Sequence, residues 1–274
     1  MDFLNSIILL TNFIIVPGIT YGSQLALGAI GVTLIYGVLR FANFAYGDLM
    51  AFGTMVVILM TWYLQSKGIS FGLLPTALLA LPIGILLTIA VSLFFDKTVF
   101  EYYRNKKSNP VTFIVVSLGI MFVLNAVVRI IIGPNDINFM DGHKFIMKAR
   151  EFKQLTGLNE GLAIKSTQVI TLVTTIITCS ILFYFLNKTK TGKSMRAYSN
   201  NEDLALLSGI DPKKIVLITW VIVSILATVA GTLYGLDKSF KPFTYFNNLL
   251  PIFAATIVGG IGNPLGAFYG GFLI

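Results

Sequence analysis

The chain has 274 residues, of which 55% are hydrophobic and 12% charged, whereas a soluble domain carries about 25% charged residues. With a mean hydropathy of +0.82, this composition excludes an ordinary soluble protein. Because the apolar residues come in long runs, it predicts an all-α, polytopic transmembrane helical bundle. The net charge of +8 does not indicate a nucleic-acid partner, because the basic residues lie between the apolar runs, as in loops of membrane proteins.

The first element is a short apolar stretch, Ile7–Val16. A spanning helix needs about 20 residues, so this stretch cannot cross a bilayer by itself. Pro17-Gly18 follows directly, which makes it an interfacial or tilted element, or the first arm of a kinked helix. Seven candidate spans come after it, and glycine and proline interrupt some of them: Gly18–Leu39, Tyr46–Leu64, Phe71–Phe95, Val111–Ile132, Thr167–Leu186, Ile215–Leu236 and Leu249–Ile274.

The stretch RFANFAYGDLMAFG, Arg40–Gly53, places polar groups between the first two of these spans. In one interpretation Arg40–Ala45 is a tight cytoplasmic turn. Asp48 then lies in the first turn of the next helix, where the helix dipole favours a carboxylate. In the other, the helix breaks within the membrane, and freed backbone groups and the Asn43 amide line a pathway. Spacing alone slightly favours the turn.

Two long polar segments separate the later spans. Residues 133–166 are mixed in charge and are expected to form an external loop, and residues 187–214 are expected to be cytoplasmic. Within the second segment, a short helix begins with Glu202 and Asp203 and stops at Gly209. This helix could lie on the membrane or fit a groove on a partner. Its apolar edge consists of Leu204, Leu206, Leu207 and Ile210.

The last apolar segment, Pro251–Gly271, is rich in glycine. Gly262, Gly266 and Gly270 recur at four-residue spacing, which predicts a glycine face for close helix–helix packing. Asn263-Pro264 interrupts this face and predicts a kink. The same pattern would also suit a seam between two subunits along a pathway.

The basic residues divide unevenly between the two sides of the predicted bundle. Eleven lie on one side and eight on the other, so the positive-inside rule makes the first side cytoplasmic. The first side holds Arg40, Lys97, Arg104, Lys106, Lys107, Lys188, Lys190, Lys193, Arg196, Lys213 and Lys214. The second side holds Lys67, Lys144, Lys148, Arg150, Lys153, Lys165, Lys238 and Lys241.

Few residues are available for catalysis or metal binding. Cys179 is the only cysteine and lies in an apolar run, so we expect no disulfide and no metal site. His143 is the only histidine and lies in a polar loop, which leaves no Ser/His/Asp or Cys/His set. The chain also lacks the G-x-x-x-x-G-K-[ST] motif of phosphate-binding loops. We therefore expect no catalytic residue, no cofactor and no ATP hydrolysis by this chain.

Four blocks of sequence together carry a family resemblance. They are GVLRFANFAYGDLMAFG (Gly37–Gly53), TGKSMRAYSNNEDLALLSGID (Thr191–Asp211), ATVAGTLYG (Ala227–Gly235) and FAATIVGGIGNPLGAFYGG (Phe253–Gly271). In order and spacing they resemble the membrane-spanning permeases of bacterial ABC importers for branched-chain amino acids, in the wider family that includes ribose-type sugar permeases. The resemblance covers nearly the whole chain and implies one transmembrane permease domain over residues 1–274.

The resemblance implies a role for two of these blocks. Arg40–Gly53 is similar to the block that borders the translocation pathway, which favours the broken-helix interpretation; the pathway residues are Asn43, Phe44, Tyr46, Gly47 and Asp48. Thr191–Asp211 is similar to the coupling loop that docks on cytoplasmic ATPase subunits. The matching coupling residues are Gly192, Arg196, Ala197, Leu204, Ala205, Gly209 and Ile210.

The sequence departs from the family pattern at three places. Tyr46 stands where the family usually has His, and Asp48 stands where it usually has Glu, so the substrate could differ from leucine-like amino acids. The chain stops at Gly270-Gly271-Phe-Leu-Ile, whereas the family runs on through a further apolar stretch. We therefore expect the C-terminal helix to be missing from this sequence.

The function that the resemblance implies is that of a transport subunit in the bacterial inner membrane. It would import amino acids, most simply branched-chain or hydrophobic ones, from a periplasmic binding protein. Its partners would be a second permease subunit in a heterodimer, two cytoplasmic ATPase subunits and membrane lipid. The alternatives are a secondary carrier that uses Asp48 as a proton or cation site, or an ABC permease for another small solute such as urea or amides.

Overall fold

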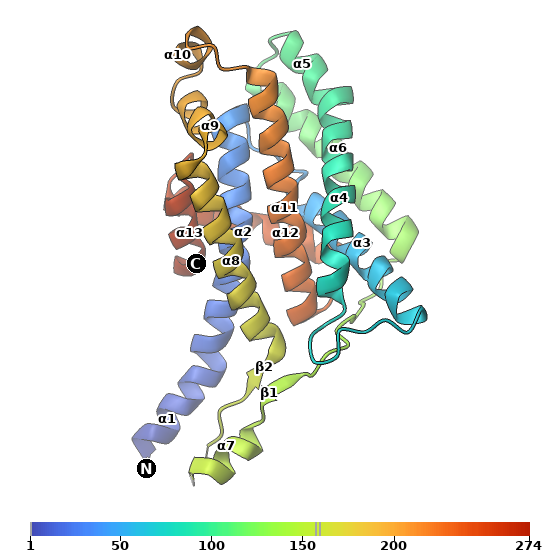
Figure 1. The fold of residues 1–274 in the computed structure, drawn as a ribbon, viewed down its shortest axis with the longest axis vertical. Coiled ribbons are helices and arrows are strands. Elements are labelled where there is room, and N and C mark those ends of the chain that lie inside the picture. Colours follow the sequence, from blue (N-terminus) through green and yellow to red (C-terminus); the bar gives the residue numbers. More distant parts are fainter. Residues whose placement is uncertain (1, 157, 159) are drawn as a thin grey trace.

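The computed structural model describes residues 2–156, 158 and 160–274 as an elongated bundle of helices (Figure 1). Its first half comprises α1 (Asp2–Leu10), the π-helical turn η1 (Thr11–Ile15), α2 (Val16–Leu39), α3 (Tyr46–Ser66), α4 (Ala77–Phe95), η2 (Asp96–Phe100), α5 (Glu101–Asn105) and α6 (Pro110–Ile132). Its second half comprises β1 (Phe145–Met147), α7 (Ala149–Thr156), β2 (Ile164–Lys165), α8 (Ser166–Lys188), α9 (Lys190–Asn200), α10 (Glu202–Leu207), α11 (Pro212–Lys238), α12 (Pro242–Gly259) and α13 (Pro264–Leu273).

Six helical segments in the described part of the chain are long and apolar enough to cross a membrane. This confirms the prediction of an all-α polytopic bundle. The α4 segment begins at Ala77 rather than at the predicted Phe71, because Pro75 disfavours helix at the residue before it. The six segments are Phe3–Leu39, Tyr46–Ser66, Ala77–Asn105, Pro110–Ile132, Ser166–Lys188 and Pro212–Lys238.

The N-terminal apolar stretch is the first arm of one long helix. α1 continues through η1 into α2, so Ile7–Val16 is neither a separate span nor a separate interfacial element. Pro17 stands in the first turn of α2 and has no N–H to donate to a preceding carbonyl. The π-helical turn η1 directly before α2 accommodates this missing hydrogen bond. α1 projects beyond the bundle at the end where α7 lies (Figure 1).

α2 is the central helix of the bundle. It is buried on nearly every side from Thr20 to Val38, and its neighbours are α8, α11, α12 and α13. Small residues allow this crowding: a β-carbon on Gly28 would lie 2.8 Å from the Ile252 side chain of α12. A helix that is apolar all round and buried all round is expected at the centre of such a bundle.

The last apolar segment is a helical hairpin, so the prediction of one span over Leu249–Ile274 is wrong. α12 ends at Gly259, and α13 begins at Pro264 and runs back along α12. Gly260 and Gly262 reverse the chain with φ of 92° and 85°, a conformation that favours glycine. Neither helix is among the described segments that are both long and apolar enough to cross a membrane.

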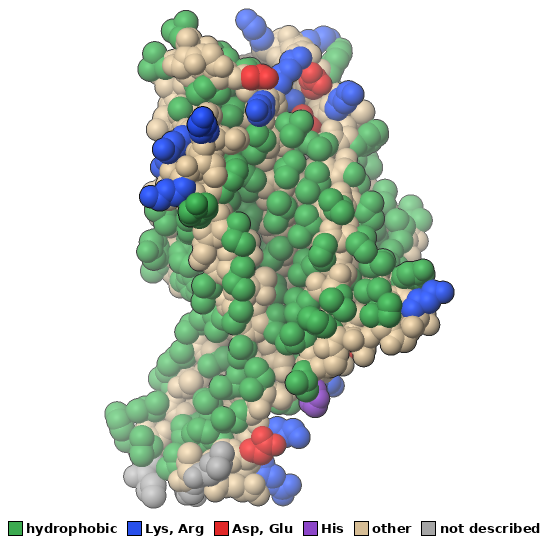
Figure 2. Space-filling view, viewed as in Figure 1, with side chains coloured by type: hydrophobic (Ala, Val, Ile, Leu, Met, Phe, Trp, Pro, Cys, Tyr) green, Lys and Arg blue, Asp and Glu red, His purple; other side chains and the backbone are tan. Residues whose placement is uncertain are grey.

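The two ends of the bundle differ in their elements and in their charge. α5, α9 and α10 lie together at one end, and α7, β1 and β2 lie at the other (Figure 1). Figure 2 shows a broad hydrophobic surface between them, with Lys and Arg gathered over the first end. The segment that carries α7 is tied to the N-terminal helix, since the Asn12 side chain donates to the Gly161 carbonyl at 2.7 Å and accepts from the Ala163 N–H at 3.0 Å.

Candidate functional site

The connection between α2 and α3 breaks the helical path inside the bundle. α2 ends at Leu39, and Arg40 adopts a left-handed conformation with φ of 61°, which stops the helix. The Arg40 guanidinium donates to the Ser199 carbonyl of α9. α3 then begins at Tyr46, part-way along the bundle rather than level with the end of α2 (Figure 1). The residues after Arg40 are thereby carried back among the spanning helices.

Asn43 and Phe44 form the turn that precedes α3. The Asn43 side chain is 3% exposed, and its Oδ1 accepts from the Ala45 N–H at 3.0 Å. The Phe44 N–H donates to Ser117 Oγ of α6 at 3.1 Å, and the Phe44 ring lies 5.4 Å from the Phe253 ring of α12. The turn is therefore held to both α6 and α12.

Tyr46 and Gly47 begin α3 and approach two other helices closely. Tyr46 is fully buried, and its ring lies directly against Gly31 of α2, where a β-carbon would overlap the phenol. Gly47 meets α12, where a β-carbon would lie 2.8 Å from the Tyr245 carbonyl oxygen. The Tyr46 hydroxyl has no hydrogen-bond partner among the described residues. Glycine at positions 31 and 47 thus allows α2, α3 and α12 to meet at the break.

Asp48 stands in the first turn of α3 and has no exposed surface. Its Oδ1 accepts from Asn125 Nδ2 of α6 at 2.7 Å, and its Oδ2 has no partner in the described part of the chain. One turn further along α6, the Arg129 guanidinium lies 5.7 Å from the centre of the Phe243 ring. The structure therefore buries a carboxylate beside the helix break with a single amide as its direct partner.

The second candidate segment, residues 187–214, contains two short helices. Thr189 caps α9 and Asn201 caps α10, each with a side-chain oxygen that accepts from a backbone N–H at 3.0 Å. Gly209, with φ of 77°, ends the second helix. A helix that begins with Glu202 and stops at Gly209 is what the sequence predicted; α9 was not predicted.

The predicted coupling residues divide into an inner and an outer group. Gly192 is buried against the end of α8, Ala205 is buried, and Ile210 is half-buried against the core. The outer group is exposed and consists of Arg196, Ala197, Leu204 and Gly209.

The leucines of α10 are exposed, while a hydrogen bond from α9 holds the first residue of the helix. Leu204 is 61% exposed and Leu207 is 85% exposed, although both are large apolar side chains. The buried Tyr198 of α9 donates from its hydroxyl to Glu202 Oε1 at 2.6 Å. Burial and the Glu202 carboxylate raise the pKa of Tyr198, so its hydroxyl stays protonated and keeps donating. An apolar helix edge is thus held out from the basic end of the bundle.

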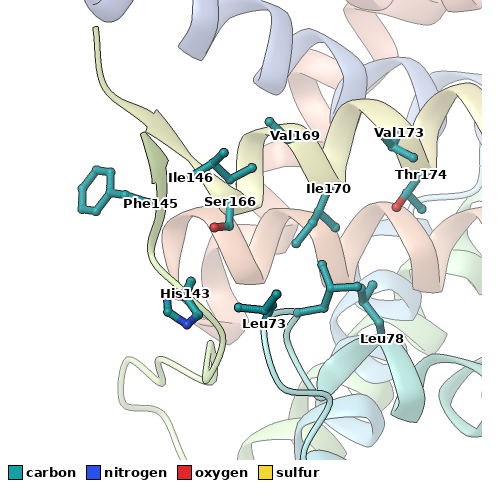
Figure 3. Close-up of a pocket in the computed structure, with 11 residues that line it drawn as sticks. Leu73, Leu78, His143, Phe145, Ile146, Ser166, Val169, Ile170, Val173 and Thr174 are labelled. Carbon is teal, nitrogen blue, oxygen red and sulfur yellow. The ribbon is translucent and has the colours of Figure 1, made fainter. Parts of the chain in front are cut away.

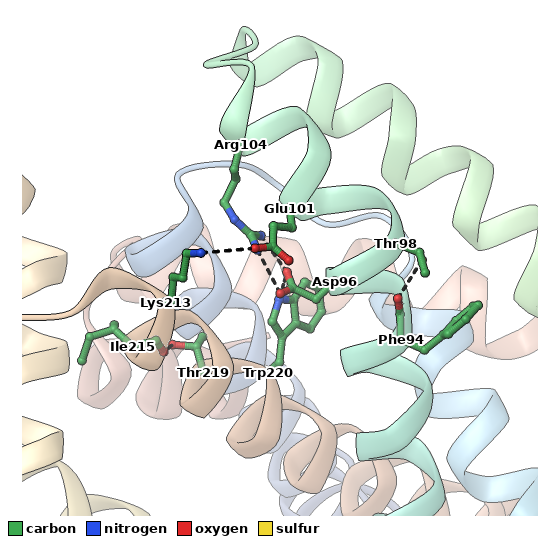
Figure 4. A network of polar contacts seen from close by, with 9 residues as sticks. All are labelled: Phe94, Asp96, Thr98, Glu101, Arg104, Lys213, Ile215, Thr219 and Trp220. Atoms are coloured by element: carbon green, nitrogen blue, oxygen red, sulfur yellow. Dashed lines mark hydrogen bonds and ion pairs between the residues drawn. The ribbon is translucent and has the colours of Figure 1, made fainter.

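A polar network next to α10 joins α4 to α11 (Figure 4). Asp96 accepts both Arg104 guanidinium nitrogens, at 2.6 and 2.9 Å, and also the indole N–H of Trp220 at 2.7 Å. Lys213 pairs with Glu101 at 3.7 Å. Sequence analysis did not single out this network, because Asp96 and Arg104 are eight residues apart, beyond the spacing of three or four at which side chains on one helix are neighbours.

The three glycines of the last segment have different positions. Gly266 and Gly270 lie on α13 where it meets α12, and a β-carbon on either would overlap a backbone carbonyl of α12. Gly262 does not share this face, because it lies in the turn between the two helices, where its N–H donates to Thr33 Oγ1 at 2.8 Å. The expected single glycine face is therefore corrected to a pair of packing glycines and one turn glycine.

Comparison with known proteins identifies the family. The family described as "Branched-chain amino acid transport system / permease component" matches residues 14–274. The chain belongs to this family. This agrees with the resemblance in the four sequence blocks, which all lie inside the matched range.

Curated relatives span nearly the whole permease at modest identity. The "High-affinity branched-chain amino acid transport system permease protein LivH" of Escherichia coli K12 is 27% identical over 262 residues, which cover 94% of this chain and 81% of the relative. The protein BraD of Pseudomonas aeruginosa is 27% identical over 270 residues, covering 95% and 82%. The "Probable branched-chain amino acid transport permease protein LivH" of Methanocaldococcus jannaschii is 30% identical over 269 residues, covering 96% and 78%. No solved structure matches this chain.

The family and the fold agree on the kind of protein. The permease is a multi-pass membrane protein, and its relatives are transport subunits rather than enzymes. It is the transmembrane subunit of an ABC importer, and a secondary carrier is not favoured, because the relatives are permeases of amino acid transport systems.

Proposed function

We propose that this permease imports branched-chain or other hydrophobic amino acids across the bacterial inner membrane. It pairs with a second, different permease subunit, receives substrate from a periplasmic binding protein and is driven by two cytoplasmic ATPase subunits. The match of residues 14–274 to the permease family carries the proposal, and the names of the relatives supply the substrate class. ATP hydrolysis belongs to the ATPase subunits.

The exposed edge of α10 supports the ATPase contact. Leu204, Leu206 and Leu207 are exposed beside a fixed helix base at the end that the positive-inside rule makes cytoplasmic. Exposed leucines on a short rigid helix are suited to a groove on a soluble partner. The network around Asp96 adjoins this helix and joins α4 to α11, so a force on α10 would reach two spanning segments.

The helix break supports a pathway at Asn43–Asp48. α3 begins among the spanning helices, and Asn43 and Asp48 are buried there. Buried polar and ionisable groups at membrane depth are costly and tend to mark transport pathways. Phe44 is the partly exposed member of the group, and it contacts Phe253 of α12.

The outer face of α12 supports a second permease subunit. α12 is not among the segments that are both long and apolar enough to cross the membrane, yet a stripe of its apolar side chains at helical spacing is exposed, together with the polar Asn247. Such a mixed stripe is unsuited to lipid alone and suits a wet interface between subunits. The apolar members of the stripe are Phe243, Leu250, Ile257 and Val258.

Uptake into proteoliposomes tests the proposal. The vesicles hold the permease with its genomic-neighbour permease and ATPases, the binding protein is outside, and ATP is inside or absent. Labelled leucine should enter only with internal ATP and should not respond to a protonophore. Uptake that ignores ATP and collapses with the proton gradient would establish the carrier instead, and uptake of urea but not leucine would correct the substrate class.

Two variants separate the proposed roles. Leu204→Ser with Leu207→Ser should leave the permease folded but abolish stimulation of the ATPases and uptake, because the exposed leucines stabilise only the contact with a partner. Ile69→Ser is the matched control, since Ile69 is 47% exposed at the opposite end.

Asp48→Asn should leave uptake dependent on ATP; a loss of proton dependence in this variant would favour the carrier.

A further inference from the structure

A cluster of aromatic rings lies between the turn that precedes α3 and the polar network at the basic end of the bundle. The centre of the Phe41 ring, in that turn, lies 5.2 Å from the centre of the Phe113 ring of α6 and 5.3 Å from that of Phe100. The Phe100 ring lies 5.4 Å from the Trp220 ring of α11. All of these side chains are buried. Rings at such separations attract one another beyond their apolar burial, so each ring helps to fix the position of the next.

Trp220 joins this aromatic cluster to the polar network. Its indole N–H donates to Asp96 Oδ1 at 2.7 Å, and the same carboxylate accepts the Arg104 guanidinium at 2.6 and 2.9 Å (Figure 4). Asp96 and Phe100 are the first and last residues of η2, so one turn of helix holds both partners of Trp220. η2 is a π-helical turn, and such turns are rare and occur frequently at functional sites.

The polar network reaches the first residue of α10 across a pocket of about 560 Å³. η2 and α5 contribute Asp96 and Arg104 to its lining, and α9 and α10 contribute Tyr198 and Glu202. Burial and Glu202 raise the pKa of Tyr198, and the positive charge of Arg104 counteracts this rise. The guanidinium therefore lies within electrostatic reach of the phenol that holds α10.

The other end of the aromatic cluster borders the predicted pathway. Phe41 lies two residues before Asn43 in the same turn. A cavity of about 10 Å³ is lined by Asn43 and Ala45 of this turn together with Phe100 and Trp220. A cavity of this size holds no more than about one water molecule. Because the surrounding side chains are closely packed, a displacement of either ring is passed on to the turn.

We infer that Phe41, Phe100 and Trp220 are positioning residues that transmit the movement of the ATPases to the helix break. When the ATPases move α10, the Asp96 carboxylate shifts with η2, Phe100 and Trp220 follow it, and Phe41 changes the position of the turn that contains Asn43. This inference rests on the proposed function, because it requires ATPases at α10 and a pathway at the break. It adds the route between those two sites.

The coupling of ATP hydrolysis to uptake tests this inference in the complete importer, reconstituted with its binding protein. The measured quantity is the amount of labelled leucine taken up per ATP hydrolysed. Trp220→Phe keeps a ring against Phe100 but loses the bond to Asp96, and Phe41→Leu removes the ring at the turn. Each variant should still hydrolyse ATP, while uptake per ATP falls about fivefold, the effect of one hydrogen bond or one aromatic pair. The double variant should lose no more than the larger single loss, because both changes act on one route.

The controls truncate packed side chains that lie off this route. Phe183→Leu breaks the contact of the Phe183 ring with the Phe268 ring of α13. Ile170→Ala removes a buried side chain that points toward Leu73 and Leu78 at the opposite end of the bundle (Figure 3). Both controls should lower the unfolding temperature of the permease without changing uptake per ATP.

A thiol at the break supplies a second test that needs no transported substrate. In a Cys179→Ser background, the partly exposed position 44 is changed by Phe44→Cys, and its labelling by a maleimide is followed by mass spectrometry of the permease. The labelling rate should change when ATP and vanadate are added to the complete importer. Trp220→Phe or Phe41→Leu should abolish that change.

The outcomes separate this inference from the proposed function. A labelling rate that ignores ATP while the aromatic cluster is intact would overturn both. The inference alone would be overturned by variants that respond to ATP as the intact cluster does, or by variants in which hydrolysis and uptake fall together. Controls that lose uptake per ATP to the same extent would also overturn it.

Discussion

At the scale of single residues, the helix break depends on glycines that admit larger neighbours. Gly31 of α2 leaves the space that the Tyr46 ring fills, and Gly47 lets α3 approach the backbone of α12. Asp48 then reaches Asn125 across the same region at 2.7 Å. These contacts fix where α3 starts, so the position of the polar residues follows from side-chain volume as much as from polarity.

Gly31→Ala is therefore expected to destabilise the permease by about 2 kcal/mol, because the added methyl group overlaps the buried Tyr46 phenol. Thermal unfolding in detergent measures the change. Gly18→Ala on the same helix is the matched control, since no atom lies within 4 Å of its β-carbon position, and it should unfold at or above the wild-type temperature. Equal unfolding temperatures for the two variants would show that the Tyr46 ring moves away without cost.

At the scale of elements, close backbone contact holds the α12–α13 hairpin together. Gly266 and Gly270 bring α13 onto α12, and Gly271 and Gly22 bring α13 and α2 together. Without a hydrophobic driving force between helices in lipid, such small-residue packing is the main source of association. The hairpin takes the place of a spanning helix in this part of the bundle.

Gly270→Ala should weaken the hairpin, because its β-carbon would overlap the Ala255 carbonyl oxygen of α12. A loss of about 2 kcal/mol in unfolding free energy is expected. Gly119→Ala of α6 is the control for replacing a helical glycine by alanine, since no atom lies within 4 Å of its β-carbon position. Limited proteolysis near Gly260 measures opening of the hairpin, and cleavage no faster in the variant than in the control would contradict this packing.

Asp141 links two external connections and makes their stability depend on pH. Burial raises the pKa of Asp141, but hydrogen bonds from Thr76 and Gln65 outweigh it and hold the pKa below its ordinary value of 3.8. A depressed pKa stabilises the folded state above the unfolded pKa, and this stabilisation is lost as pH falls through the folded value.

Unfolding temperature measured from pH 7 down to pH 3 should therefore fall at the acid end. Asp141→Asn should unfold at a lower temperature at pH 7 and show a flatter acid dependence, because the charged acceptor is gone. Asp136→Asn is the control, since Asp136 is 58% exposed in its pair with Lys241. Identical acid profiles for Asp141→Asn and the wild type would rule out this contribution.

At the scale of the whole molecule, one end is basic and carries α10, and the other carries β1, β2 and α7 (Figures 1 and 2). In the proposed importer, the ATPases and the binding protein act from opposite sides of the membrane, so these two ends are expected to lie on opposite sides. The positive-inside rule predicts that α10 lies in the cytoplasm.

Labelling with a membrane-impermeant maleimide tests this orientation. In a Cys179→Ser background, Lys153→Cys should react from the outside of intact cells, and Leu207→Cys should react only after lysis, because the two sites lie at opposite ends of the bundle. Cys179 is buried in α8, and serine in a helix can donate its hydroxyl to the carbonyl one turn back, so the replacement should not affect the fold greatly. Reaction of Leu207→Cys in intact cells would invert the orientation.

The sequence by itself determined the elements whose signal is local. Composition and apolar runs predicted the all-α bundle and six of the seven spans, with the start of α3 at Tyr46 read correctly. The acidic residues Glu202 and Asp203 in the first turn and the stop at Gly209 likewise predicted α10. Each of these depends on residues that are close along the chain.

Only the tertiary structure decided the features that depend on distant residues. The apolar segment after Leu249 looks like one span, yet it folds back. Gly266 and Gly270 of α13 pack directly against the backbone carbonyls of Gly259 and Ala255 in α12. Asn125 lies in an ordinary apolar run and becomes notable only because the fold places it beside Asp48. Hydropathy does not distinguish a helix that crosses the bilayer from a hairpin packed against α2, because both bury apolar surface and differ only in backbone contacts between segments.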